Sequence, residues 1–534
     1  MASAKAIAAA VIVIIIVVAV GVYFAMPQAP PQEEQPPEQP PQGPQYADTI
    51  VIGTTDKVTD LDPSNAYDFF TWEVLNNIME GLVKYEPGTD NLVPGIAESW
   101  EVQDGGSVWV FYLKQNVSFA DGTPLTAQDV VRSVKRVMNI NGDPAWLVTE
   151  FVDDVVALDD YTVKFILKKP VGYFLAVVAT PPYFPVHPNY PDDEIVSDAT
   201  WGGAGPYYIS EFKRDEYIVL EANPYYHGAQ PKTPKVIIRF YKDAATLRLA
   251  LENGEIDIAW RTLRPTDYRD LAENPDFNVI EVPGSFIRYI VVNVQMEPVN
   301  NKLVRQAIAA AINRAEIADV VFLGTMEPLF SLVPQGMWSH IDALEELYGD
   351  GNTELAVQLL NEAGYNETHK LQLVLWYTPT HYGDTEVDIA QLIKQQLEAT
   401  GVIEVDIEST EWAAYVDQLR NGQMMLSLLG WYPDYVDPEN FLYPFLHSQA
   451  NSWTGTGYAN PEVDQLLEQA SVESDQSVRT QLYEQVQQIL ADELPFIPIL
   501  QGKLLIVTHK SVGGVQLGPS MLLSYYTIYK VLES

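Results

Sequence analysis

The stretch from residue 424 to residue 442 reads Met-Met-Leu-Ser-Leu-Leu-Gly-Trp-Tyr-Pro-Asp-Tyr-Val-Asp-Pro-Glu-Asn-Phe-Leu. Its first part, Met424 to Leu429, predicts a buried strand, since the apolar run is too short to form a helix of its own. Gly430 to Asp434 then follow at the strand end, where open α/β sheets bind their ligands. A glycine and two prolines give this loop a rigid backbone, as a binding loop needs. The same residues would also suit an ordinary Pro-rich turn, so the loop alone leaves both interpretations open.

Length and composition limit the kinds of protein that this chain can be. Its 534 residues are too many for one compact domain, so two or three lobes are expected. The absence of cysteine excludes disulfides, thiol catalysis and cysteine-based metal sites. A net charge of -41 disfavours a nucleic-acid partner, although it also simply serves solubility. The 30 tyrosines and 11 tryptophans can fill cores, and they also suit a ligand-contacting cleft.

The N-terminal region predicts attachment to a membrane. Residues 6–26 carry no charged side chain and are rich in Ile and Val. At about 1.5 Å per residue, such a helix would span the roughly 30 Å core of a bilayer. Signal peptides usually have a shorter apolar region of about 7–15 residues. We therefore interpret 1–26 as an uncleaved anchor, with a cleaved signal as the alternative. The Pro-rich residues 27–47 predict an extended stalk, which places the remainder on the extracellular face.

The rest of the chain alternates between strand and helix patterns. Strand-like runs at 371–376 and 402–407 flank a helical pattern at 387–400, and similar alternation elsewhere predicts an α/β fold with a largely parallel sheet. A single long helix is expected over 303–321, and a hairpin over 155–167.

Motifs of catalysis are missing from the sequence. We find no Gly-x-Ser-x-Gly, no His-Glu-x-x-His, and no Walker or dinucleotide-binding pattern. The seven histidines have no metal-ligand spacing. Gly202 to Gly205 come nearest to a phosphate loop, but a proline follows them in place of lysine. We therefore predict a binding protein without catalytic residues, metal or cofactor, and keep an extracellular hydrolase as the alternative from another class.

Several phrases occur in the order in which one known family has them. They are Leu61-Asp62-Pro63, Asn77-Ile78-Met79-Glu80-Gly81-Leu82-Val83, Ala97-Glu98-Ser99-Trp100, Phe119 to Val130, Gly205-Pro206-Tyr207, Asn223-Pro224-Tyr225-Tyr226, Gly254-Glu255-Ile256-Asp257, Val304-Arg305-Gln306-Ala307 and Asp434 to Leu442. From about residue 48 to 531 the chain resembles the family 5 extracellular solute-binding proteins of ABC importers, of the oligopeptide/dipeptide-binding type.

The resemblance implies a class II periplasmic-binding-protein-like fold with two α/β lobes and an extra subdomain. Ligand binds between the lobes, which close on it, and an ABC transporter permease receives it from a receptor expected to be a monomer. On this chain, lobe I corresponds to residues 48–92, 201–283 and 505–534. Subdomain II corresponds to 93–200 and lobe III to 284–504.

The resemblance also implies which residues bind an oligopeptide. An extended peptide pairs its backbone with two protein segments, which gives affinity with little side-chain selectivity. Gly430, Trp431 and Tyr432 match one segment, and a loop with Tyr67 and Phe69 lies where the other is expected. Asp434 matches the aspartate that pairs with the peptide ammonium, a strong charge-assisted contact in a closing cleft. A role in its own turn is the alternative for this residue.

One departure from the family pattern leaves the chemical class of the ligand undecided. Dipeptide binders grip the peptide carboxylate with an arginine after the strand that corresponds to 371–376, and residues 377–382 hold no arginine. His381 is a candidate for that role, with Tyr382 beside it. Some members bind oligosaccharides, and Tyr432, Tyr67 and Tyr382 are suited to stacking on sugar rings, as are Trp431 and Trp376. An oligosaccharide receptor is therefore the second interpretation within the family.

Overall fold

The computed structural model describes residues 45–532 except 380 and 383–384. The predicted anchor, residues 1–26, lies outside the described residues, as does nearly all of the stalk. Within the described part, no helix is both long enough and apolar enough to cross a bilayer. The described residues from Tyr46 onward form one compact unit.

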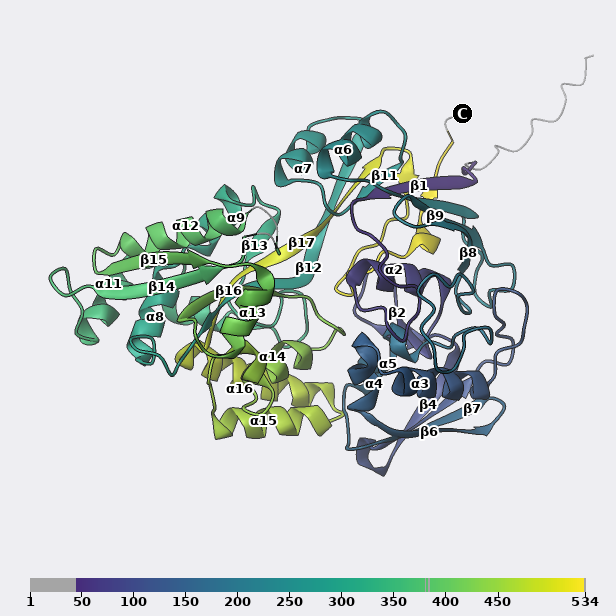
Figure 1. The fold of residues 1–534 in the computed structure, drawn as a ribbon, viewed down its shortest axis with the longest axis horizontal. Helices are drawn as coiled ribbons and strands as arrows, with labels where there is room; N and C mark the ends of the chain where they lie inside the picture. The colour runs from purple at the N-terminus through teal and green to yellow at the C-terminus, as the bar shows by residue number, and fades with distance from the viewer. Residues whose placement is uncertain (1–44, 380, 383–384, 533–534) are drawn as a thin grey trace, which may run out of the picture. The chain divides into compact units, whose positions relative to one another are not determined.

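One large sheet organises this unit (Figure 1). Among the described residues it has eleven strands, in the order β15 (Ile403–Ser409), β14 (Leu371–Tyr377), β16 (Leu426–Trp431), β12 (Phe277–Val292), β17 (Phe496–His509), β11 (Ile258–Trp260), β1 (Thr49–Thr54), β10 (Lys235–Phe240), β9 (Tyr217–Ala222) and β8 (Tyr207–Lys213), with β13 (Met326–Pro328) paired to β17. The long strands β12 and β17 run side by side and connect the two ends of the sheet.

The prediction of a largely parallel sheet is wrong. Strand β1 pairs in parallel with β10 and β11, and β14 does so with β15 and β16. The ladders β8–β9, β9–β10, β11–β17, β12–β16, β12–β17 and β13–β17 are antiparallel. The β–α alternation correctly indicated the parallel pairs, but the partners of β12 and β17 lie far away in sequence and have no local signal.

A second sheet is antiparallel and four-stranded, in the order β4 (Ala97–Gln103), β5 (Val108–Leu113), β7 (Thr162–Leu167) and β6 (Val152–Asp159). The pair β6–β7 confirms the predicted hairpin. Helix α3 (Ala127–Ile140) packs beside β6 and begins with a capping box, in which the Thr126 amide donates to Asp129 Oδ2 at 2.8 Å. Two small ladders pair β2 (Val83–Tyr85) with β3 (Leu92–Pro94), and β18 (Val512–Gly513) with β19 (Tyr529–Lys530).

The remaining helices cover the sheets. In the described part they are α2 (Phe69–Ile78), α4 (Trp146–Thr149), α5 (Phe174–Val178), α6 (Ala244–Glu252), α7 (Pro265–Ala272), α8 (Lys302–Ala311), α9 (Arg314–Val320), α10 (Ala343–Tyr348), α11 (Thr353–Glu362), α12 (Glu386–Glu398), α13 (Trp412–Arg420), α14 (Glu439–Leu446), α15 (Pro461–Val472) and α16 (Gln476–Glu493). The single helix expected over 303–321 is two, because Asn313 leaves the helical backbone and its side chain accepts the Glu316 amide to cap α9.

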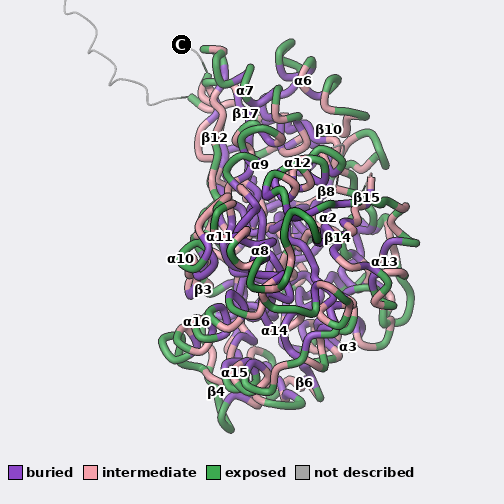
Figure 2. Tube along the Cα trace, turned by 90° about the vertical axis from the view of Figure 1, so that its left-hand side faces the viewer, coloured by how far each residue is buried: buried purple, intermediate pink, exposed green. Residues whose placement is uncertain are grey.

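Alternating side chains of β12 serve two cores, as the two-residue period of a strand requires. Ile290 and Val292 pack with α8 and α12 on one face, whereas Tyr289 and Val291 pack with α13 to α16 on the other. Buried residues fill the interior between the outer helices and loops (Figure 2). Strand β16 lies between β14 and β12, as expected for the apolar run, and four of its residues from Leu426 to Leu429 are buried.

The glycine-rich segment 202–205 has a packing role. The amides of Gly203 and Gly205 both donate to the Ile78 carbonyl at the end of α2. A Cβ on Gly205 would lie 2.5 Å from backbone atoms there. Glycine therefore allows close approach of two backbones at this position.

Candidate functional site

Asp434 lies in the loop between β16 and α14, and its carboxylate joins two distant segments. Oδ1 accepts a hydrogen bond from the hydroxyl of Tyr67 at 2.6 Å, across 367 positions of sequence. Oδ2 accepts from Nδ2 of Asn440 at 3.3 Å, and the Asp434 amide donates to Oδ1 of Asn440 at 2.9 Å. Asn440 therefore fixes the loop, and Tyr67 brings the segment before α2 to the carboxylate.

The charge of Asp434 has no cationic partner among the described residues: neither of its hydrogen-bonding side chains, Tyr67 and Asn440, is charged. Burial raises the pKa of Asp434 to about 6, although the hydrogen bonds from these two side chains lower it. A half-buried carboxylate without a counter-ion is costly. A ligand cation would relieve that cost.

Aromatic rings from three segments meet at Tyr432, two residues before this carboxylate. The Tyr432 ring stacks on Phe286 of β12, with centroids 5.0 Å apart and planes at 11°. It also lies 6.3 Å from the ring of Phe69. Tyr432 is 45% exposed and Tyr67 is 42% exposed, so both retain surface for a ligand. The predicted residues Tyr67, Phe69, Tyr432 and Asp434 are thus brought together.

Gly430 lies in a crowded part of β16, opposite Arg288 of β12. The hydroxyl of Tyr382 donates to the Gly430 carbonyl at 3.3 Å, and the Arg288 guanidinium lies 4.0 Å from the centre of the Tyr382 ring. A Cβ on Gly430 would lie 3.0 Å from both side chains. Arg288 also forms an ion pair of 2.6 Å with Glu386. Glycine leaves the room that Tyr382 and Arg288 need.

His381 and Trp431 contact other residues than Tyr67 and Phe69. The His381 ring stacks on Trp412 with centroids 3.6 Å apart, and burial together with Arg288 lowers the His381 pKa. A neutral imidazole is a poor partner for a ligand carboxylate. Trp431 packs against Phe445 and Trp453 and donates to Asn440 Oδ1 at 3.2 Å, so its ring supports the loop from inside.

The family model of bacterial extracellular solute-binding proteins, family 5 (Middle), matches residues 91–453. The chain belongs to this family. It is 29% identical over 500 residues to the dipeptide-binding protein DppE of Bacillus subtilis, covering 87% of this chain and 89% of DppE. The structure of HbpA2 from Haemophilus parasuis matches with a TM-score of 0.83 and 26% identity, covering 91% of this chain and all of that one. DppA from Helicobacter pylori in complex with the peptide STSA matches with a TM-score of 0.74 and 26% identity, over 91% of this chain and 99% of DppA.

Membership settles the class of protein. Family 5 proteins are substrate-binding receptors and not enzymes, so the prediction of a binding protein is confirmed and the hydrolase alternative is set aside. The mixed α/β fold of periplasmic peptide-binding proteins is confirmed as well.

The residues from Tyr435 to Asn440 belong to a family phrase, but the sequence predicted no individual role for them. Tyr435 stacks on Tyr173, with centroids 5.6 Å apart, and the Tyr173 hydroxyl donates to Glu439 Oε1 at 2.9 Å. Burial raises the pKa of Glu439 to about 7, against the lowering effect of hydrogen bonds from Tyr435 and Tyr173. Asp437 accepts two hydrogen bonds from Arg479, at 2.6 and 2.9 Å. No local pattern could indicate these partners, because Tyr173 and Arg479 lie far from the loop in sequence.

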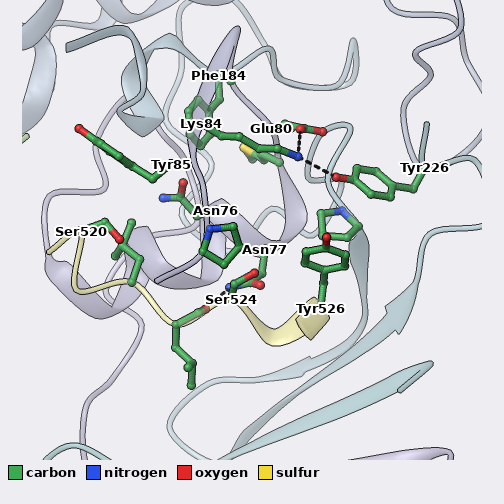
Figure 3. Close-up of a pocket in the computed structure, with 16 residues that line it drawn as sticks. Asn76, Asn77, Glu80, Lys84, Tyr85, Phe184, Tyr226, Ser520, Ser524 and Tyr526 are labelled. Carbon is green, nitrogen blue, oxygen red and sulfur yellow. Dashed lines mark hydrogen bonds and ion pairs between the residues drawn. The ribbon is translucent and has the colours of Figure 1, made fainter. Parts of the chain in front are cut away.

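A separate cavity of about 110 Å³ lies at the end of α2, next to the C-terminal segment 520–526 (Figure 3). Its charged groups are paired with each other: Lys84 contacts Glu80 at 2.5 Å and the Tyr226 hydroxyl at 3.1 Å. Tyr85 lines the cavity, and its hydroxyl accepts the Val436 amide at 3.2 Å. The cavity therefore adjoins the loop after β16, but none of the residues predicted to bind ligand lines it.

Proposed function

We propose that this protein captures oligopeptides outside the cell, in a cleft between two lobes, and delivers them to the permease of an ABC importer. The observation that carries the proposal is the carboxylate of Asp434, which is half-buried and has no cationic partner among the described residues. An ammonium has three N–H donors, so a peptide N-terminus can share this carboxylate with the Tyr67 hydroxyl. Relatives named dipeptide-binding proteins support the same ligand class.

We also propose for this chain the lobe boundaries that the family resemblance implies. Residues 48–92, 201–283 and 505–534 would form lobe I, 93–200 subdomain II, and 284–504 lobe III. Tyr67 and Phe69 would then belong to lobe I, and Asp434 and Tyr432 to lobe III. Peptide binding between these pairs would draw on both lobes, as a closing receptor requires.

We further propose that residues 1–26 hold the receptor at the extracellular face of the membrane. Secretion after signal cleavage is the alternative. Detection of the full-length chain in the membrane fraction supports the anchor, whereas a mature chain that begins after residue 26 in the medium contradicts it.

An oligosaccharide is the second candidate ligand, because Tyr432 and Tyr67 present partly exposed rings suited to sugar faces. A thermal-shift screen distinguishes the two ligand classes, since a ligand that binds only the folded state raises the melting temperature. We expect di- to pentapeptides to raise it and neutral oligosaccharides to leave it unchanged. Stabilisation by oligosaccharides alone would overturn the peptide proposal.

A further inference from the structure

Asp56 and Arg261 follow the carboxyl ends of two neighbouring parallel strands, β1 and β11. In open α/β sheets, ligands bind outside the carboxyl ends of such strands. Arg261 Nε forms an ion pair with Asp56 Oδ2 at 3.0 Å. Arg261 and Thr262 have φ angles of 57° and 60°, which are unfavourable for residues other than glycine. The Thr55 amide donates to Thr262 Oγ1 at 3.2 Å and helps to hold this backbone. Strained backbone of this kind is often found at functional sites.

The guanidinium of Arg261 is held in place but keeps donors free. Its centre lies 4.4 Å from the centre of the Phe69 ring, and the side chain is 21% exposed. Across the described residues, neither Nη atom of Arg261 donates a hydrogen bond to the protein, and its ion pair with Asp56 is made through Nε. Arg136 and Arg479 differ, because their Nη atoms bind carboxylates of the protein.

Phe69 connects Arg261 to the proposed peptide site. The Phe69 ring lies 6.3 Å from Tyr432, and Tyr67, two residues earlier, donates to Asp434. Arg261 is also close enough to Tyr432 for an electrostatic interaction. A guanidinium with free donors and a carboxylate without a counter-ion thus lie along the same group of aromatic rings.

We propose that the two Nη atoms of Arg261 bind a carboxylate of the peptide, so that the ligand of this receptor carries a free carboxylate as well as an ammonium. This inference rests on the proposed function. Arginine presents its N–H groups in a planar fork that matches both oxygens of a carboxylate. Arg261 would supply the function that the family's arginine after 371–376 cannot supply here. Arg288 is less suited, because its Nε donates to the Leu429 carbonyl, its Nη2 donates to Glu386, and the residue is only 6% exposed.

Calorimetric titration with tri-alanine and its C-terminal amide tests the proposal. The wild-type protein should bind tri-alanine at least tenfold more tightly than the amide. Arg261→Gln should abolish this preference while leaving affinity for the amide within about twofold. Arg269→Gln is the matched control, because Arg269 is 57% exposed and its ion-pair contact is to the neighbouring Asp270; its preference should equal that of the wild type. An amidated peptide with one glutamate distinguishes a side-chain carboxylate from the C-terminal one.

The outcomes separate this proposal from the function on which it rests. If Arg261→Gln binds peptides with the wild-type preference for the free acid, the role of Arg261 is refuted and peptide binding stands. If no peptide binds the wild-type protein, both proposals fail. Arg261→Lys keeps the positive charge beside Asp56, so it tests the role of Arg261 even if the glutamine variant misfolds. The lysine variant should bind tri-alanine at least fivefold more weakly than the wild type and should bind the amide equally well. Equal weakening of binding for both peptides would refute the role.

Discussion

Two aspartates of one loop, Asp434 and Asp437, have opposite environments. Asp437 is 4% exposed and accepts two hydrogen bonds from Arg479, so its charge is balanced within the protein. Asp434 is half-buried and its hydrogen-bond partners, Tyr67 and Asn440, are neutral. The charge of Asp437 is thus neutralised within the fold, whereas the described residues supply no counter-ion to Asp434, as its proposed role in binding an ammonium requires.

This difference divides the loop into two parts. From Tyr435 onward the side chains pack against Tyr173 and Arg479, and they fix the loop. From Gly430 to Asp434 the residues face Tyr382, Phe286 and Phe69, and Tyr432 stays partly exposed. A rigid second half would hold the first half ready for a ligand and so reduce the entropy lost on binding.

The largest expected effect is on stability and concerns Asp437. Asp437→Asn leaves the buried Arg479 without its counter-ion, which should lower the free energy of unfolding by about 3–5 kcal/mol. Differential scanning calorimetry measures the loss as a lower melting temperature. Asp192→Asn is the control. The Asp192 side chain is 68% exposed, so its ion pair with Arg132 should contribute little to stability. A melting temperature equal to that of the control would show that Asp437 has no special role.

The second effect is on binding and concerns Asp434. Asp434→Asn removes the charge but keeps a similar shape, so peptide affinity should fall by about 1.5–3 kcal/mol, roughly 10- to 150-fold. Melting of the ligand-free protein should stay the same or occur at higher temperature, because an uncompensated charge has been removed. Calorimetric titration and thermal melting give both values. A clear loss of stability with unchanged affinity would place Asp434 in the same class as Asp437.

The raised pKa of Asp434 predicts a pH dependence. The ammonium needs the ionised carboxylate, and with a pKa of about 6 the ionised fraction falls about tenfold from pH 7 to pH 5. Peptide affinity should therefore fall about tenfold over this range, and Asp434→Asn should lose the dependence. Stability of the ligand-free protein changes in the opposite sense: this group stabilises the fold at acid pH, and the contribution is lost as pH rises through about 6. Affinity independent of pH would contradict the assignment.

The smallest effect concerns Tyr67. Its hydrogen bond lowers the pKa of Asp434, so Tyr67→Phe should move the midpoint of the pH–affinity profile upward by less than about one unit. Affinity at pH 8 should change only a few-fold, because a single hydrogen bond contributes about 0.5–1.5 kcal/mol. A downward shift of the midpoint would show that Tyr67 does not stabilise the carboxylate.

Sequence patterns located the core of the fold but not its long-range pairing. The apolar run ending at Leu429 predicted β16, and the residues after it fell beside the loop that holds Tyr67. The antiparallel pairing of β12 with β17 could not be predicted, since the paired residues lie more than 200 positions apart. The break at Asn313 was missed because apolar periodicity continues across it, whereas a single capping side chain ends one helix and starts another.

The sequence placed Asp434 and Tyr432 in one loop directly after a strand, as the structure has them, and their role in ligand binding stays a prediction. Arg261 and Arg288 were not predictable, since their roles depend on partners brought in by the fold, Asp56 and Phe69 for one and Glu386 and Tyr382 for the other. The sequence signal that could have indicated Arg261 is its position directly after strand β11, which follows the family phrase 254–257.

The central claim is that Asp434 receives the ammonium of a peptide, and blocking that ammonium tests it most directly. Tri-alanine and N-acetyl-tri-alanine would be titrated into the wild-type protein and Asp434→Asn. The account predicts that acetylation weakens binding to the wild type at least tenfold and changes binding to the variant less than about twofold. Equal weakening in both proteins would contradict the claim.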